Sequence, residues 1–387
     1  MKADGQEVES RVQRHGGNRY GREILLDFSV NTNPLGMPDD IRAALKSALE
    51  TPSFWEWYPD PDCGRLRQSL SVYHDIAREQ IVCGNGASEL IFVIVRSVLS
   101  EKREEKGARS GLRCLLPVPS FGEYERALLA AGAEIVYDRL KECAHFAPTE
   151  ELADRITEET ALLFLCSPGN PTGALIRPAL LWKILERCER TGTYVLLDTC
   201  FLELAGEGGG REAFLAAPAA EGGTCTYRQI LETYPHLILL KAFTKLYAMP
   251  GLRLGYCLCG TAGAAERIRE QLSCWNVSAT AQYAGLTALD SEKNADYIGQ
   301  SVRMIREQRK LLENGLADLG IKALPGQANF ICFYSNKSLY QPLLEKGILI
   351  RDCGSFRGMG EGWYRVAVKK QEENEKLLRE MGIILKR

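Results

Sequence analysis

The stretch "HLILLKAFTKLYAMPGLRLGYCL", residues 236–258, joins two short apolar runs through a polar, glycine-containing turn. Short apolar runs bounded by turn residues are typical of buried strands. Lys245 and Arg253 flank the turn. A lysine in such a place can form a Schiff base, and an arginine can grip a phosphate through two parallel hydrogen bonds. The stretch therefore predicts two strands with a candidate site at their connection.

Similar apolar runs recur along the chain and alternate with helical patterns. The strand candidates are residues 79–84, 113–119, 134–140, 161–168, 193–200, 236–243 and 252–258. Residues 87–100 and 178–192 carry apolar side chains three and four positions apart, as amphipathic helices do. This alternation predicts an α/β fold in which helices cover both faces of a mostly parallel central sheet.

The pattern changes after residue 262. Long charged helices are expected at 263–275 and 294–320, and strands at 328–335, 347–353 and 363–368. These elements predict a smaller α+β domain at the C-terminus. We therefore divide the chain into an N-terminal arm at 1–40, a large domain at 41–262 and a small domain at 263–387. The glycine- and alanine-rich segment 206–223 is expected to be a surface excursion.

Composition excludes several classes of function. The 387 residues are 45% hydrophobic and have a formal charge of -2, and the interspersed charges give no footprint for nucleic acid. No apolar run reaches the length of about 18 residues that a membrane span needs, and no signal peptide is recognisable, so we expect a cytoplasmic chain. The 13 cysteines are scattered singly and are expected to be core thiols. Cys257 and Cys259 lack a second pair at zinc spacing, so no metal site is predicted.

Polar residues follow several of the predicted strands, at the sheet edge where α/β proteins bind ligands. Residues 84–89, "GNGASE", open a helix and can hold a phosphate, although alone they are also an ordinary turn. Asn170 lies just beyond another strand in "CSPGNPTG", where it can be a simple turn residue or point an amide outward. Asp198 ends the strand "TYVLLD", where it either caps the next segment of the chain or needs a polar partner.

Together these residues meet the needs of pyridoxal 5'-phosphate. Its aldehyde requires a lysine, its ring nitrogen a carboxylate, its phenolate oxygen a donor, and its phosphate a helix start with an arginine. The sequence supplies each group, in order, on successive strand ends.

At this point the chain resembles, over nearly its whole length, the fold-type I pyridoxal-phosphate enzymes of the class I/II aminotransferase group. The motif "TKLYAMPGLRLGY" carries the resemblance most clearly. By this resemblance Lys245 is the Schiff-base lysine, Asp198 is the partner of the ring nitrogen, and Asn170 donates to the phenolic oxygen. The fold, the cofactor and an enzymatic activity follow as expectations.

The resemblance also assigns further cofactor contacts. The residues expected at the phosphate are Ala87, Ser88, Thr244 and Arg253. Phe121, in "PVPSFGEYE", matches the aromatic residue that stacks on the cofactor ring. Tyr58, in "WYPDPDCGRLR", matches a tyrosine that reaches the cofactor phosphate from the neighbouring subunit. The resemblance therefore implies a homodimer with shared sites.

Two branches of this group compete, histidinol-phosphate aminotransferase and the threonine-phosphate decarboxylase of cobalamin biosynthesis. Residues 15–18, "HGGN", residues 25–38 and Trp275 in "CWNVSA" are similar to the decarboxylase branch. Phe201 replaces a tyrosine usual in the aminotransferases. The chain departs from both branches in reading "DTCF" at 198–201, where "DEAF" or "DEAY" is expected.

The decarboxylase resemblance implies a set of substrate contacts. These are His15, Gly16, Asn31, Asn170, Arg351 and Arg365. A substrate with a phosphate and a carboxylate needs more than one cation, and arginines supply planar forks that stay charged. The alternative for either arginine is a surface salt bridge.

Three hypotheses follow. The favoured one is decarboxylation of O-phospho-L-threonine, and the second is an aminotransferase that uses histidinol phosphate or a related amine with 2-oxoglutarate. Which Cα bond stands perpendicular to the cofactor ring decides between them, and the sequence does not report that angle. The third, a non-catalytic cofactor-binding or regulatory protein, is disfavoured because the cofactor residues are all present.

Overall fold

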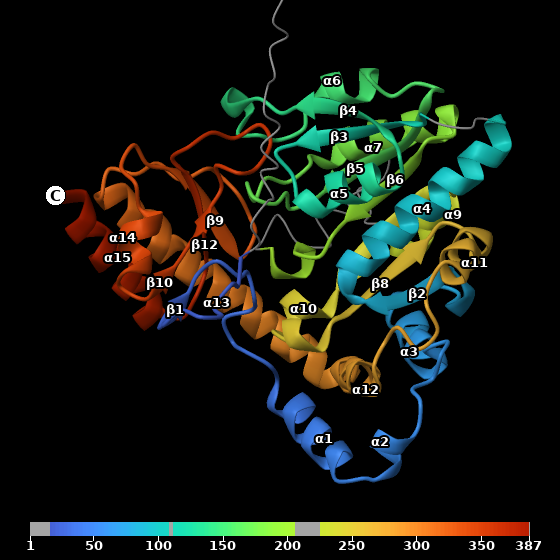
Figure 1. The fold of residues 1–387 in the computed structure, drawn as a ribbon, viewed down its shortest axis with the longest axis horizontal. Coiled ribbons are helices and arrows are strands. Elements are labelled where there is room, and N and C mark those ends of the chain that lie inside the picture. The colour runs from blue at the N-terminus through green and yellow to red at the C-terminus, as the bar shows by residue number, and fades with distance from the viewer. Residues whose placement is uncertain (1–15, 108–110, 206–224, 387) are drawn as a thin grey trace, which may run out of the picture.

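A seven-stranded sheet forms the centre of the molecule (Figure 1). The computed structural model describes residues 16–107, 111–205 and 225–386. The strand order is β2-β8-β7-β6-β5-β3-β4, and β8 runs antiparallel to its neighbours while the other pairs are parallel. The strands are β2 (Ile81–Asn85), β3 (Arg113–Val118), β4 (Glu134–Arg139), β5 (Thr160–Cys166), β6 (Tyr194–Asp198), β7 (Leu237–Ala242) and β8 (Leu254–Cys259). All seven strands predicted for this sheet are therefore confirmed.

Helices cover both faces of this sheet, as predicted. Successive residues of β6 point to opposite faces, so Val195 and Leu197 join one apolar cluster while Leu196 joins another. The first cluster includes α7 (Pro178–Thr191), and the second includes α4 (Gly86–Lys106). The continuous apolar runs of the sequence thus arise from strands that are buried on both sides.

A second sheet lies beside the first and has the order β11-β12-β9, all antiparallel. Its strands are β9 (Phe330–Tyr334), β11 (Arg351–Asp352) and β12 (Trp363–Ala367), and it packs with α13 (Ser291–Asp318) and α15 (Gln371–Lys386). The strand predicted at 347–353 is divided into β10 (Ile348–Leu349) and β11, because the two parts pair with different strands. The proposed domain boundary at residue 262 stays a prediction.

The partner of β10 is β1 (Leu26–Asp27), a short parallel strand that the sequence did not predict. Phe28, which follows it, is fully buried in the apolar cluster of α13 and α15. Residues 26–28 are therefore built into the core beside the second sheet.

The remaining helices complete the fold. They are α1 (Asp39–Leu49), α2 (Ser53–Glu56), α3 (Gly64–His74), α5 (Gly122–Ala130), α6 (Glu150–Asp154), α9 (Tyr227–Thr233), α10 (Phe243–Leu246), α11 (Ala262–Glu270), α12 (Ala279–Ala288) and α14 (Tyr340–Leu344). Within the described parts of the chain, no helix has both the length and the apolarity to cross a membrane. Most of the 13 cysteines are buried as expected, but Cys143 and Cys274 are exposed. The glycine-rich segment 206–223 lies outside the described residues.

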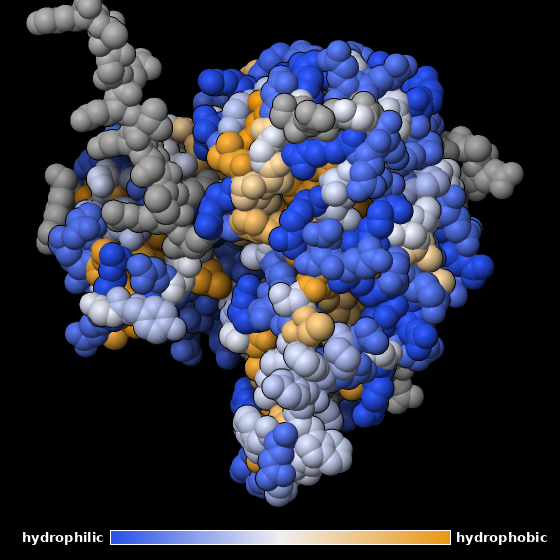
Figure 2. All heavy atoms as spheres, turned by 45° about the vertical axis from the view of Figure 1, so that its right-hand side comes forward, coloured by the Kyte–Doolittle hydropathy of each residue, from blue (hydrophilic) through white to orange (hydrophobic). Residues whose placement is uncertain are grey.

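The α1–α2 region projects from the body of the molecule (Figure 1). Figure 2 shows it at the bottom as a mostly pale surface, in the middle of the hydropathy scale where tryptophan and tyrosine fall. We call Phe54, Trp55, Trp57 and Tyr58 the aromatic projection. Trp55, Trp57 and Tyr58 are 61%, 74% and 77% exposed, which is unusual for side chains of this size.

Candidate active site

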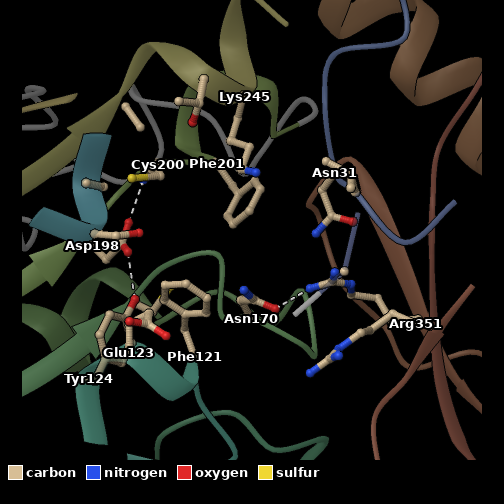
Figure 3. Close-up of a pocket in the computed structure, with 18 of the residues that line it drawn as sticks. Asn31, Phe121, Glu123, Tyr124, Asn170, Asp198, Cys200, Phe201, Lys245 and Arg351 are labelled. Atoms are coloured by element: carbon tan, nitrogen blue, oxygen red, sulfur yellow. Dashed lines mark hydrogen bonds between the residues drawn. The ribbon is translucent and has the colours of Figure 1, made fainter. Parts of the chain in front are cut away.

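A cavity of about 470 Å³ opens beside the carboxyl ends of the parallel strands (Figure 3). The predicted site residues that line it are Gly16, Asn31, Ala87, Ser88, Phe121, Asn170, Asp198, Thr244, Lys245, Arg253, Arg351 and Arg365. Tyr58 does not line it and belongs to the exposed aromatic projection. His15 lies outside the described residues. One cavity thus collects nearly all the residues that the sequence analysis selected.

Lys245 points into this cavity from α10, the short helix after β7 (Figure 3). Burial, and then the positive charge of Arg365, lower the pKa of Lys245 to about 8. A substantial fraction of the amine is therefore neutral near physiological pH. A neutral amine is the form that attacks a carbonyl.

Asp198 lies at the end of β6 on one side of the cavity. Its Oδ1 accepts a hydrogen bond from the Cys200 backbone N–H at 2.9 Å, and its Oδ2 accepts one from the Tyr124 hydroxyl at 2.7 Å. Burial, and then the charge of Asp198, raise the pKa of Tyr124, so the phenol keeps its proton. The site presents a buried carboxylate that can pair with a protonated ring nitrogen.

The turn from β2 into α4 forms a cradle for an anion. A Cβ on Gly86, which has a φ of 75°, would lie 2.6 Å from Arg253 Nη2, and a Cβ on Gly255 would lie 2.6 Å from the Ala87 nitrogen. Glycine is therefore needed at both positions for Arg253 and β8 to approach the start of α4 this closely. The helix dipole and the first backbone N–H groups, including that of Ser88, favour a phosphate here.

Arg351 and Arg365 face each other across the β11–β12 pair. They are only 7% and 6% exposed, and within the described residues neither forms an ion pair. Burial, and to a lesser degree the charge of Arg351, lower the pKa of Arg365 to about 10. Like charges directly opposite each other destabilise a sheet, and buried charges without partners are costly. This wall of the cavity therefore has a strong requirement for an anionic ligand.

Arg365 also orients Asn170. Its Nη1 donates to Asn170 Oδ1, its Nη2 donates to the Ser29 carbonyl at 2.9 Å, and its Nε is buried without a partner. Because the oxygen of the Asn170 amide faces Arg365, the nitrogen faces the middle of the cavity (Figure 3). Asn31 Oδ1 is likewise buried without a hydrogen-bond partner among the described residues. These unsatisfied groups fit a cavity that is completed by polar ligands.

The sequence analysis did not single out Glu123, Tyr124 and Phe356, which also line the cavity. Tyr124 lies three residues after Phe121 at the start of α5, and this helical spacing could have identified it. No comparable signal marks Phe356, which follows β11. Phe201 lines the cavity without a hydroxyl and packs edge-on against Phe330 at a ring distance of 5.1 Å.

Comparison with known proteins agrees with this geometry. The family described as aminotransferase class I and II matches residues 23–381. The chain is 33% identical over 383 residues to the threonine-phosphate decarboxylase of Salmonella typhimurium, with 96% of each chain covered. It is 31% identical over 384 residues to a histidinol-phosphate aminotransferase of Methanosarcina mazei, with 98% of this chain and 92% of the relative covered.

A solved structure also matches nearly the whole fold. The histidinol-phosphate aminotransferase from Clostridium acetobutylicum has a TM-score of 0.78 at 28% sequence identity, covering 94% of this chain and 99% of that one. The family match extends over both sheets and the cavity between them. The chain therefore belongs to the aminotransferase class I and II family, whose members depend on pyridoxal 5'-phosphate.

Proposed function

We propose that this protein decarboxylates O-phospho-L-threonine to 1-aminopropan-2-ol phosphate and CO2. The observation that carries the proposal is the opposed, buried pair Arg351 and Arg365. A substrate with both a phosphate and a carboxylate brings enough negative charge for two guanidinium groups and matches their planar forks. The name of the Salmonella typhimurium relative supports the same reaction. In this reaction the bond from Cα to the carboxylate breaks, CO2 leaves, and a proton adds to Cα.

We propose that the cofactor occupies the inner part of the cavity. Lys245 would bind its aldehyde and Asp198 its ring nitrogen, while the Asn170 amide nitrogen would donate to its phenolate oxygen and Phe121 would stack on its ring. Its phosphate would be held by Ala87, Ser88, Thr244 and Arg253. When bound, the cofactor withdraws electrons from Cα of the attached amine and so weakens the Cα bond perpendicular to its ring.

The outer part of the cavity would bind and orient the substrate. Arg365 contacts Asn170 and is thus next to the proposed ring position, whereas Arg351 lies beside Phe356. We assign the carboxylate to Arg365 and the phosphate to Arg351, with help from Asn31, Gly16 and the N-terminal His15. Lys245, with a pKa of about 8, can hold the proton that Cα receives.

A second candidate is a histidinol-phosphate aminotransferase. The observation in its favour is the 31% identity to the Methanosarcina mazei relative that bears this name. Its substrate has a phosphate but no carboxylate, so the amino acceptor 2-oxoglutarate would have to supply a carboxylate to the second arginine. The two candidates therefore differ in whether 2-oxoglutarate is consumed.

Phosphorus NMR with mass spectrometry tests the proposal. The protein loaded with pyridoxal phosphate is incubated with O-phospho-L-threonine, with and without 2-oxoglutarate. We expect 1-aminopropan-2-ol phosphate and CO2 in both mixtures. No such product, together with glutamate formed from histidinol phosphate and 2-oxoglutarate, would establish the second candidate instead.

The Tyr124→Phe variant is expected to weaken cofactor binding about fivefold to tenfold. The variant removes a 2.7 Å hydrogen bond to the Asp198 carboxylate, and bonds to charged groups contribute about 1.5 to 3 kcal/mol before any compensation by water. Titration of the cofactor-free protein with pyridoxal phosphate measures the change. Tyr194→Phe is the matched control. Tyr194 is the first residue of β6, and its hydroxyl donates a 2.9 Å hydrogen bond to the Glu101 carboxylate. Equal affinities in the two variants would contradict the role of Tyr124.

We further propose that a second copy of the chain covers the aromatic projection and receives Tyr58 at its cofactor phosphate. Tyr58 stacks on Trp275 at a ring distance of 4.4 Å, so it is held in place although it is largely exposed. Replacing both Trp55 and Trp57 by Asp is expected to give monomers in light scattering and to lower activity at least about tenfold. Ile383→Asp, at an exposed position on α15, is the control that should stay dimeric. Dimers of the double variant would count against this surface.

A further inference from the structure

The connection between β11 and β12 carries a side chain that supports Arg351. Phe356 in this connection is 3% exposed and lines the cavity. The Arg351 guanidinium lies over its ring, with Cζ 4.9 Å from the ring centroid. Among the described residues the Arg351 side chain has no hydrogen bond or ion pair, so the cation–π contact with Phe356 is its most specific support.

The next residue, Arg357, is bound to a distant part of the chain. Its Nε lies 3.1 and 3.2 Å from the two carboxylate oxygens of Glu125, and its Nη2 lies 2.5 Å from Oε1. The same guanidinium lies over Tyr137, with Cζ 4.5 Å from the ring centroid, and the Tyr137 hydroxyl donates to Glu125 Oε1 at 2.7 Å. We call Glu125, Tyr137 and Arg357 the clasp. Each of its three members contacts the other two.

The backbone beside the clasp is also close to the central sheet. A Cβ on Gly358, which has a φ of 89°, would lie 3.3 Å from the Val118 carbonyl oxygen at the end of β3. Glu125 belongs to α5, the helix that begins directly after Phe121. Figure 1 shows the connections of the second sheet reaching the ends of β3 and β4. The clasp therefore joins the segment that supports Arg351 to the wall of the cofactor part of the cavity.

We propose that Arg357 is a positioning residue for the anionic substrate, because the clasp holds Phe356 beneath Arg351 and so fixes the Arg351 guanidinium at the cavity wall. This inference rests on the proposed function and extends it to residues that do not contact the substrate. Arg357 and Glu125 are 48% and 21% exposed, so their ion pair adds little to global stability. The three contacts between Arg357 and Glu125 instead fix the direction of the segment around Phe356, as bidentate pairs do.

The test uses the protein loaded with pyridoxal phosphate and inorganic phosphate as the probe. The clasp variants are Arg357→Ala and Glu125→Gln, and Arg357→Lys keeps the charge without the fork. Arg177→Ala is the matched control, since Arg177 forms a surface ion pair with Glu150 at 3.0 Å. Calorimetry measures phosphate affinity, and hydrogen exchange with mass spectrometry measures protection of residues 353–358.

Each clasp variant is expected to weaken phosphate binding about fivefold to tenfold and to speed exchange at residues 353–358. The double variant of Arg357 and Glu125 should be no weaker than either single variant, because both changes open the same contact. The control should change neither quantity. Arg357→Lys should fall between the wild type and Arg357→Ala.

Two results would overturn the inference. The first is an unchanged phosphate affinity in the clasp variants, whether or not hydrogen exchange at residues 353–358 is faster. A wild-type protein that fails to bind phosphate would overturn both this inference and the anion site on which the proposed function depends. Formation of a product other than 1-aminopropan-2-ol phosphate would affect only the proposed reaction, because the clasp is tested by phosphate affinity and exchange.

Discussion

Lys245→Ala is expected to lower turnover at least about 10³-fold and to remove the visible absorption of lysine-bound cofactor. The variant deletes the amine that we propose joins the cofactor, which is also the group proposed to hold a proton near Cα, and a proton-transfer group alone contributes about 10²- to 10⁴-fold. Absorption spectra and product assays measure the two effects. A variant that keeps the absorption would refute the cofactor assignment of Lys245.

Replacing Lys245 is expected to stabilise the protein although it lowers its activity. Burial, and then the charge of Arg365, lower the pKa of Lys245 to about 8, below the value of about 10.4 in an unfolded chain. The native state therefore binds fewer protons, so the destabilisation is complete below pH 8 and is relieved as the pH rises toward 10.4. Lys245→Met should raise the free energy of unfolding of the cofactor-free protein at pH 7 by up to about 3 kcal/mol.

Urea unfolding at pH 7 and near pH 10 measures this gain. We expect the gain to shrink at the higher pH, because native Lys245 has by then lost its proton and the unfolded lysine, with a pKa of about 10.4, has begun to lose it. Lys322→Met, at an exposed position, is the control that should show little change at either pH. A gain that does not depend on pH would mean that packing, rather than the buried charge, explains the effect.

Arg365→Lys is expected to weaken binding of O-phospho-L-threonine about 100-fold. Lysine keeps the charge but cannot donate to Asn170 and Ser29 while also forming a planar fork with a carboxylate. Losing a partner of a buried charged group typically costs about 2 to 5 kcal/mol, and about 2.7 kcal/mol corresponds to 100-fold. Titrations followed through the cofactor absorption measure the affinity.

A pair of ligands separates the roles of the two arginines. O-phosphoethanolamine has the phosphate and the amine of O-phospho-L-threonine but lacks the carboxylate. We expect Arg365→Lys to spare its binding, whereas Arg351→Lys should weaken the binding of both ligands. Equal losses of both ligands in Arg365→Lys would contradict the assignment of the carboxylate to Arg365.

The central sheet could be predicted because most of its strands are buried on both faces, so they read as apolar runs bounded by turn residues. The edge strand β4 is only partly buried. The second sheet was harder to predict from the sequence. Residues 347–353 read as one strand, and β1 consists of Leu26 and Asp27 alone. Two residues show no periodicity, so only the pairing partner reveals such a strand.

The candidate site could be predicted where a residue ends a parallel strand, as Asp198 does, because those ends meet at one edge of the sheet. The opposition of Arg351 and Arg365 depends on the register of a strand pair, and the bond from Tyr124 to Asp198 depends on helix packing. Neither can be read from spacing alone. The roles of all the site residues, including Tyr58 and His15, stay predictions.

The pairing of β1 with β10 has a consequence for the order of events during synthesis. Leu26 lies opposite Ile348, so β1 cannot pair until nearly the whole described chain has been synthesised. The Ser29 carbonyl, two residues after β1 ends, accepts a hydrogen bond from Arg365, a contact that also needs the C-terminal part of the chain. Contacts between residues so far apart in the sequence form slowly, and during synthesis they cannot form until the later residue has left the ribosome. On the ribosome, the central sheet can therefore assemble first, and the anion-binding wall is the last part of the cavity to form.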